Sequence, residues 1–170
     1  MSLLQDSLSK AENCLKFISL LSEPCQELAT AEPKAIPGLL PRLLNTVRVI
    51  WMNSDHYKSR ERLNALLRKI SSDIIKRCSS KVSLDDIFDG HVERSRDALK
   101  EGISCCLSWK ETYEHISKIH DKFSKEGWVL DESSIFAQVD AFIQRCKDLL
   151  EVVEGQVRIA VYLPFLKLGI

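Results

Sequence analysis

Residues 92–123, VERSRDALKEGISCCLSWKETYEHISKIHDKF, carry the most extended periodic pattern in the chain. Apolar and small residues recur there at steps of three and four: Val92, Ser95, Leu99, Gly102, Cys106, Trp109, Tyr113, Ile116, His120 and Phe123. This spacing places them along one face of a single α-helix, as in a heptad repeat. Gly102 inside a helix costs about 1 kcal/mol relative to alanine, which a closely approaching neighbour could offset. The stretch therefore predicts one long helix with a helical neighbour along this face.

A second helix with the same pattern is predicted directly downstream. Asp131 to Ser134 supply capping residues. The apolar positions that follow keep the same steps: Ile135, Val139, Phe142, Cys146, Leu149 and Val153. Gly127 is expected to end the first helix of this pair and Gly155 the second, since glycine commonly follows a helix end.

Three further helices are predicted upstream. The first has its apolar face at Leu4, Leu8, Ala11, Leu15 and Ile18, and Pro24 and Pro33 interrupt the chain after it. The second covers residues 36–51 and starts with prolines in its first turn. The third covers residues 59–78, with Ser59 as its N-cap. Ser83 and Asp86 then have capping-box spacing, and Asp89-Gly90 briefly interrupts the chain.

These segments predict an all-α fold of about five amphipathic helices in an antiparallel helical bundle or array. We expect one helical region over residues 1–156, with sub-units at 1–81 and 82–156. Residues 157–170 are predicted to be a divergent, irregular apolar C-terminal tail, because they show no helical period and contain Pro164.

The charge balance excludes several classes of protein. The 170 residues include 24 Lys and Arg and 24 Asp and Glu, and 45% of residues are hydrophobic, which excludes a highly charged disordered chain. The zero net charge is a cancellation, since segment 34–81 carries +8 and segment 82–156 carries −7. The basic segment either binds nucleic acid or an acidic membrane, or it faces the acidic segment. The lack of interleaved aromatic residues for base stacking favours the second interpretation.

No motif for catalysis, cofactor binding or metal ligation is present. No glycine precedes a lysine, which excludes a P-loop, and neither Cys-x-x-Cys nor His-Glu-x-x-His occurs. His115 and His120 diverge by about 140° on a helix. The start of the chain lacks a signal peptide pattern, so the six cysteines are predicted to be free thiols in a reducing compartment. We therefore expect a protein that is not an enzyme, with no catalytic residue, cofactor or metal site.

The large side chains of the two long periodic segments are candidate interaction or core residues, and ordinary burial tendencies favour an intramolecular core over an interface for them. They are Trp109, Tyr113, Ile135, Val139, Phe142 and Leu149.

Several strings resemble the N-terminal tail of dynein heavy chains. IPGLLPRLLN begins at residue 36 and is followed by VIWMNS from residue 49. YKSRERL begins at residue 57, with LRKIS from residue 67 and Ile74-Ile75 after it. The most similar string is SIFAQVDAFIQRCKDLLEV over residues 134–152, followed by EGQ at 154–156, and it resembles axonemal chains more than the cytoplasmic one. The resemblance covers about residues 12–156.

The resemblance implies a stack of helical bundles with a role in assembly. In this family the tail joins heavy chains and carries intermediate and light chains, so the implied partners are other dynein subunits, with no nucleic acid and no membrane. The implied location is the cytoskeleton, at the ciliary axoneme, and the implied process is microtubule-based movement.

The resemblance also bounds what this chain does. The family's ATPase ring and microtubule-binding domain lie far C-terminal and are absent from these residues, which implies a non-catalytic fragment of such a heavy chain. The family pattern stops after Gln156. The alternative is a free-standing helical module that binds nucleic acid or an acidic membrane through segment 34–81.

Overall fold

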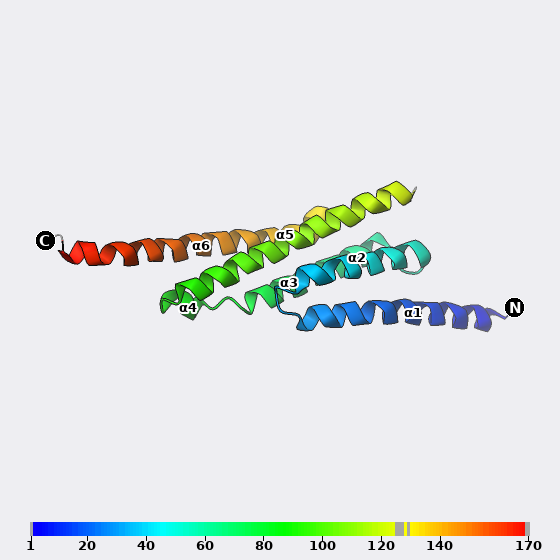
Figure 1. Cartoon of the computed structure of the whole chain (residues 1–170). Coiled ribbons are helices and arrows are strands. Elements are labelled where there is room, and N and C mark those ends of the chain that lie inside the picture. The colour runs from blue at the N-terminus through cyan, green and yellow to red at the C-terminus, as the bar shows by residue number, and fades with distance from the viewer. Residues whose placement is uncertain (1, 125–127, 129, 169–170) are drawn as a thin grey trace.

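The computed structural model describes residues 2–124, 128 and 130–168 (Figure 1). In this part of the chain all regular structure is helical, so the predicted all-α fold class is confirmed. In chain order the helices are α1 (Leu3–Thr30), α2 (Ile36–Asn53), α3 (Arg60–Ser79), α4 (Leu84–Phe88), α5 (Val92–Phe123) and α6 (Glu132–Leu168).

The long helices form three layers, and neighbours in the chain run antiparallel (Figure 1). α2 and α3 occupy the middle layer, with α5 and α6 packed on one side of it. Of the described helices, α1 alone lies on the other side, where it packs more on α2 than on α3. The middle layer is therefore covered by two helices on one side and by one on the other.

The described part of the chain contains one helix more than the five predicted, because α4 forms a separate short helix. Its N-cap is Ser83, whose Oγ accepts a hydrogen bond from the backbone N–H of Asp86 at 3.2 Å, as the predicted capping box requires. Ile87 is buried against α5. Gly90 follows with φ of +87°, a conformation that strongly favours glycine and separates α4 from α5.

The predicted irregular tail from residue 157 is wrong, because α6 continues through Gly155 to Leu168. Gly155 lacks the positive φ of a helix-ending glycine. A glycine inside a helix costs about 1 kcal/mol relative to alanine. Extending a helix that has already formed needs no new nucleation step, and each added residue contributes one backbone hydrogen bond, so the helix continues past the glycine. α1 likewise continues through Pro24. Gly127, the predicted end of the preceding helix, lies outside the described residues.

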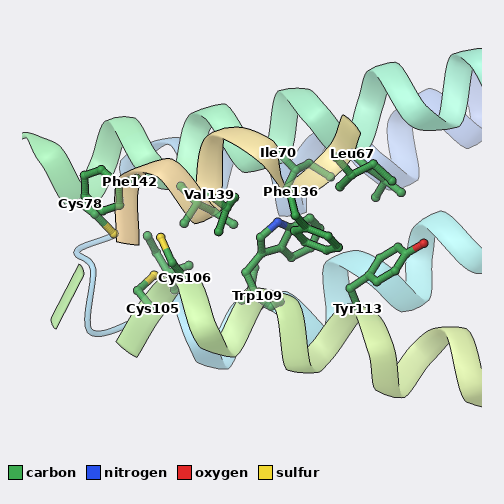
Figure 2. Packing of buried hydrophobic residues seen from close by; sticks show 14 of the residues in the cluster. Leu67, Ile70, Cys78, Cys105, Cys106, Trp109, Tyr113, Phe136, Val139 and Phe142 are labelled. Atoms are coloured by element: carbon green, nitrogen blue, oxygen red, sulfur yellow. The ribbon is translucent and has the colours of Figure 1, made fainter. Parts of the chain in front are cut away.

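The interior between α3, α5 and α6 is centred on Trp109, whose side chain is 0% exposed. Its Nε1–H donates a hydrogen bond to Ser71 Oγ on α3 at 2.9 Å. The Ser71 hydroxyl donates in turn to the backbone carbonyl of Ile135 on α6 at 3.0 Å. Phe136 packs edge-on against Trp109, with ring centroids 6.0 Å apart (Figure 2). One serine therefore links three helices at the largest fully buried side chain.

The predicted close approach at Gly102 is confirmed. A Cβ atom there would lie 3.4 Å from Phe142 Cε1 on α6 and 3.6 Å from Cys78 Cβ on α3. Ser95, the preceding small residue of this face, is also buried. α3 and α6 thus approach α5 over its small residues, and this packing offsets the propensity cost of the glycine.

Ser71→Ala is expected to destabilise the protein by about 1 to 3 kcal/mol, because it leaves the buried Trp109 N–H without an acceptor. The matched control is Ser72→Ala on the exposed side of the same helix, expected to stay within about 0.5 kcal/mol of the parent. Urea unfolding of the three proteins measures both values. Equal stability of the two variants would contradict the role of Ser71.

Gly155→Ala is expected to stabilise the protein by about 0.5 to 1 kcal/mol, because alanine is the better helix former and no atom lies within 4 Å of the Cβ position. Gly90→Ala is the opposing control, expected to destabilise by about 1 to 2 kcal/mol because of the positive φ. Thermal unfolding compares the two. A destabilising Gly155→Ala would argue against a helix through residue 155.

Candidate partner-binding surface

The candidate residues predicted on the two long periodic segments lie mainly in the interior. Five are buried in the interior: Trp109, Tyr113, Ile135, Val139 and Phe142. Figure 2 shows the side chains of Trp109, Tyr113, Val139 and Phe142. Leu149 is half-buried and packs against the same cluster. Burial raises the pKa of Tyr113 above its usual range. In this structure the six residues contact other helices of the chain, and the exposed apolar side chains lie elsewhere.

α1 presents a row of exposed apolar side chains to solvent. Leu4, Leu8, Leu15 and Ile18 are 81%, 61%, 66% and 53% exposed. With exposed Ala11 they form the face that the sequence pattern predicted, here called the α1 outer face. α1 buries a different face, which carries Pro24 and Leu28. The periodicity identified the helix correctly but could not show that this face is uncovered.

The N-terminal part of α1 extends past α2 and α3 (Figure 1). Every residue from 2 to 13 is exposed. An isolated helix of this length is marginally stable in water. Contact with a further helix along the α1 outer face would therefore stabilise this part of the protein.

An apolar cavity of about 380 Å³ opens beside the α1 outer face, between α1 and α3, with α2 as its floor. We call it the α1–α3 groove. Ile18 belongs both to the α1 outer face and to the groove. Its remaining lining is almost entirely apolar: Phe17, Leu21, Val47, Ile50, Trp51, Tyr57, Arg62, Leu63, Ala65 and Leu66. The exposed face and the groove together make one continuous apolar surface.

The sequence pattern missed the groove because its residues come from three helices. A local signal did exist on α1, where apolar residues occupy two faces of one helix. One set is exposed at Leu8 and Leu15, and the other contacts the bundle at Leu21 and Leu28. Two apolar faces on one helix indicate that it can pack against neighbours on two sides.

Basic residues lie along the side of α3 that carries the groove. Arg62 lines it and donates from Nη1 to the backbone carbonyl of His56 at 2.6 Å. Lys69 and Lys76 follow at steps of seven residues, which places them on the same side of α3. Lys69 pairs with Asp73, and its side chain stays 69% exposed. Burial and the Asp73 carboxylate raise the pKa of Cys25 on α1, consistent with this side of α3 lying beside α1.

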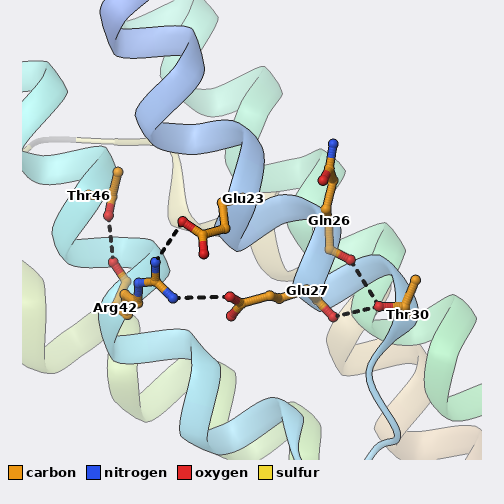
Figure 3. Close-up of polar contacts among 6 residues, drawn as sticks. All are labelled: Glu23, Gln26, Glu27, Thr30, Arg42 and Thr46. Carbon is orange, nitrogen blue, oxygen red and sulfur yellow. Dashed lines mark hydrogen bonds and ion pairs between the residues drawn. The ribbon is translucent and has the colours of Figure 1, made fainter.

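Other basic groups of segment 34–81 are engaged by α1 and the residues after it. Arg42 pairs with both Glu23 and Glu27 at 3.1 Å (Figure 3). Lys81 pairs with Glu32 at 2.7 Å, and its hydrogen bond lowers the pKa of that carboxyl. Arg77 Nε donates to the backbone carbonyl of Ala31 at 2.9 Å. Part of the basic charge thus joins helices of the same chain.

Four cysteines lie buried in the interior: Cys78, Cys105, Cys106 and Cys146. Figure 2 shows the first three beside one another. Hydrogen bonds with the Cys105 and Cys106 thiols lower the pKa of Cys78, and the same bonds together with burial raise the pKa of Cys105 and Cys106. All six cysteines are free, as predicted. Among the described residues no group of three ligands is arranged for a metal ion. In that same part of the chain no helix combines the length and apolar character of a membrane span.

Comparison with known proteins confirms the resemblance seen in the sequence strings. Residues 1–160 match the family described as dynein heavy chain, N-terminal region 1. The chain is 47% identical over 154 residues to the Dynein-1-beta heavy chain, flagellar inner arm I1 complex, of Chlamydomonas reinhardtii, an alignment that covers 91% of this chain and 3% of that protein.

Two further relatives show the same type of similarity. Human Dynein axonemal heavy chain 2 is 49% identical over 67 residues, covering 39% of this chain and 2% of that protein. The sea urchin Tripneustes gratilla has a Dynein beta chain, ciliary, that is 27% identical over 157 residues, covering 89% of this chain and 4% of that protein. The chain therefore spans only a few per cent of the length of these relatives.

Leu8→Ala on the α1 outer face is expected to change the free energy of unfolding by less than about 0.5 kcal/mol, because Leu8 is exposed. Leu28→Ala on the buried face of the same helix is the matched control, with an expected loss of about 2 to 5 kcal/mol. Urea unfolding compares them. A large loss for Leu8→Ala would mean that the α1 outer face is covered within the chain.

Proposed function

The chain belongs to the dynein heavy chain N-terminal region 1 family, and from this membership we propose that it acts as a non-catalytic tail segment in dynein assembly. In this proposal it binds other heavy chains and the intermediate and light chains. The relatives are named as axonemal, ciliary and flagellar chains, which supports a place in the ciliary axoneme and a role in microtubule-based movement.

The observation that carries the proposal is the α1 outer face together with the α1–α3 groove. Large contiguous apolar surfaces on a folded protein commonly mark interaction sites. Leu8, Leu15 and Ile18 are exposed on one helix, and Ile18 leads directly into the groove. A surface of this kind suits helix-to-helix assembly, in which apolar anchors at heptad spacing enter a groove.

The rest of the fold supports a scaffolding role. The links from Trp109 through Ser71 to Ile135 hold α3, α5 and α6 together, so α1 is presented on a packed base. The family match covers only the N-terminal region, and the proposal assigns the ATP-driven chemistry of dyneins to other parts of heavy chains.

Binding of nucleic acid or an acidic membrane through segment 34–81 is the alternative function. Ion pairs and hydrogen bonds of Arg42, Arg77 and Lys81 to α1 and residues 31–32 reduce the charge available to a polyanion. The exposed Lys69 and Lys76 are the groups that this alternative would use.

The proposal is tested by binding of the whole chain to purified axonemal dynein intermediate and light chains. We expect specific retention, and at least a tenfold loss with Leu15→Glu, because a charge in the centre of an apolar interface removes an anchor. Leu107→Glu, at a 44% exposed leucine on α5, is the matched control and should retain binding. No retention above a scrambled helical control, or equal loss in both variants, would overturn the proposal.

A further inference from the structure

Within the described residues, the two sides of the middle layer are covered unequally. α5 and α6 cover one side of α2 and α3, but α1 alone covers the other and lies mainly over α2. The flank of α3 beside α1 is therefore open, and the α1–α3 groove lies at this place. Helical arrays expose such positions where a neighbouring helix packs.

The shape of this position fits a helix. The α1 outer face continues past Ile18 at the same heptad steps to two exposed small residues, Ser22 and Ala29. On the facing side of α3, Ala65 and Ser72 are exposed and small. Small side chains let helix axes approach closely, whereas the leucines nearer the N-terminus supply apolar contact area. From Leu4 to Ala29 this track is roughly 37 Å long, the length of a helix of about 25 residues.

The two edges of the groove carry different charge. On α3, Arg62 lines the groove, and Lys69 and Lys76 continue past it along the same side at steps of seven residues, with Asp73 paired to Lys69. Along the far side of the α1 outer face, Glu12, Lys16 and Glu23 alternate in sign. A helix that follows the groove and continues along α3 therefore meets three cations and the one carboxylate of Asp73 on that side, an excess of positive charge that its other side lacks. Complementary carboxylates on that side would steer its association and fix its register.

We propose, building on the assembly function above, that the α1–α3 groove receives one amphipathic helix of a partner chain with carboxylates along the edge that faces α3. Its apolar heptad positions contact Leu15, Ile18 and Leu66, and its carboxylates pair with Arg62, Lys69 and Lys76. A second copy of this chain fits less well, because its own exposed apolar helix carries charges of alternating sign.

The test uses two synthetic 25-residue helical peptides with leucine at heptad positions a and d. One has glutamate at e and g, and the other has lysine at the same positions. Fluorescence anisotropy with the whole 170-residue chain gives each affinity. We expect the glutamate peptide to bind at least tenfold more tightly at low salt, from three pairs that each contribute modestly, and salt to reduce this ratio.

Paired variants separate the apolar contact from the charge contact. Ile18→Glu should abolish binding of the glutamate peptide, whereas Leu107→Glu should leave it unchanged. The double variant Lys69→Glu/Lys76→Glu should reverse the preference towards the lysine peptide. Lys100→Glu/Lys147→Glu, on the exposed surfaces of α5 and α6, changes the net charge equally and should leave the preference unchanged.

Other outcomes overturn the proposal. Equal affinity for the two peptides would contradict the proposed preference for carboxylates, and binding insensitive to Ile18→Glu would place the site elsewhere. Sedimentation showing a dimer that Ile18→Glu dissociates would assign the groove to a second copy. Binding of a duplex oligonucleotide through Lys69 and Lys76, with neither peptide bound, would favour the nucleic-acid alternative. Retention of dynein subunits without peptide selectivity would reject this inference alone, whereas peptide selectivity without such retention would reject the assembly function.

Discussion

The arrangement of the long helices depends on the need to satisfy the indole N–H of Trp109 inside a closed core. The Ser71 hydroxyl on α3 accepts that hydrogen bond from α5 and donates its own hydrogen bond to the Ile135 backbone carbonyl of α6. An unsatisfied polar group at a 0% exposed position would cost about 1 to 3 kcal/mol. Ser71 on α3 lies between α5 and α6, and its two hydrogen bonds couple the position of α3 to both helices.

The position of α3 then determines the uncovered side of the molecule. One side of α3 meets α5 and α6 closely, as the contacts of Gly102 with Phe142 and Cys78 show. α1 packs on another side of α3, but it packs more on α2. Because one helix cannot cover two, the apolar groove beside Ile18 remains open. The closed core and the open groove thus lie on different sides of the layer formed by α2 and α3.

The sequence favours a basic segment that faces the acidic segment, but the ion pairs of the basic segment include contacts with the N-terminal segment. The basic segment 34–81 packs against the acidic segment 82–156, as α2 with α5 and α3 with α6. However, Arg42 and Lys81 pair with Glu23, Glu27 and Glu32 of the N-terminal segment. These contacts hold α1 on the bundle and leave Lys69 and Lys76 exposed on α3, past the end of the groove.

Local periodicity determined the helices, because a face repeated at steps of three and four is a property of one segment. It predicted α5 from Val92 to Phe123, the cap at Ser83 and the close neighbour at Gly102. The same reasoning failed at Gly155, where a general tendency to end helices was weaker than the continuation of a helix already formed. It also could not tell which apolar faces are covered.

Trp109 and Leu15 have the same kind of spacing, yet one is buried and the other is 66% exposed. That difference depends on how many helices surround each face, which is decided by contacts between distant segments. The sequence alone therefore determined the helical class and the family resemblance. Only the tertiary structure decided that α1 presents its apolar row to solvent, whereas most of the corresponding row of α5 is buried, because burial is a property of neighbours and not of spacing.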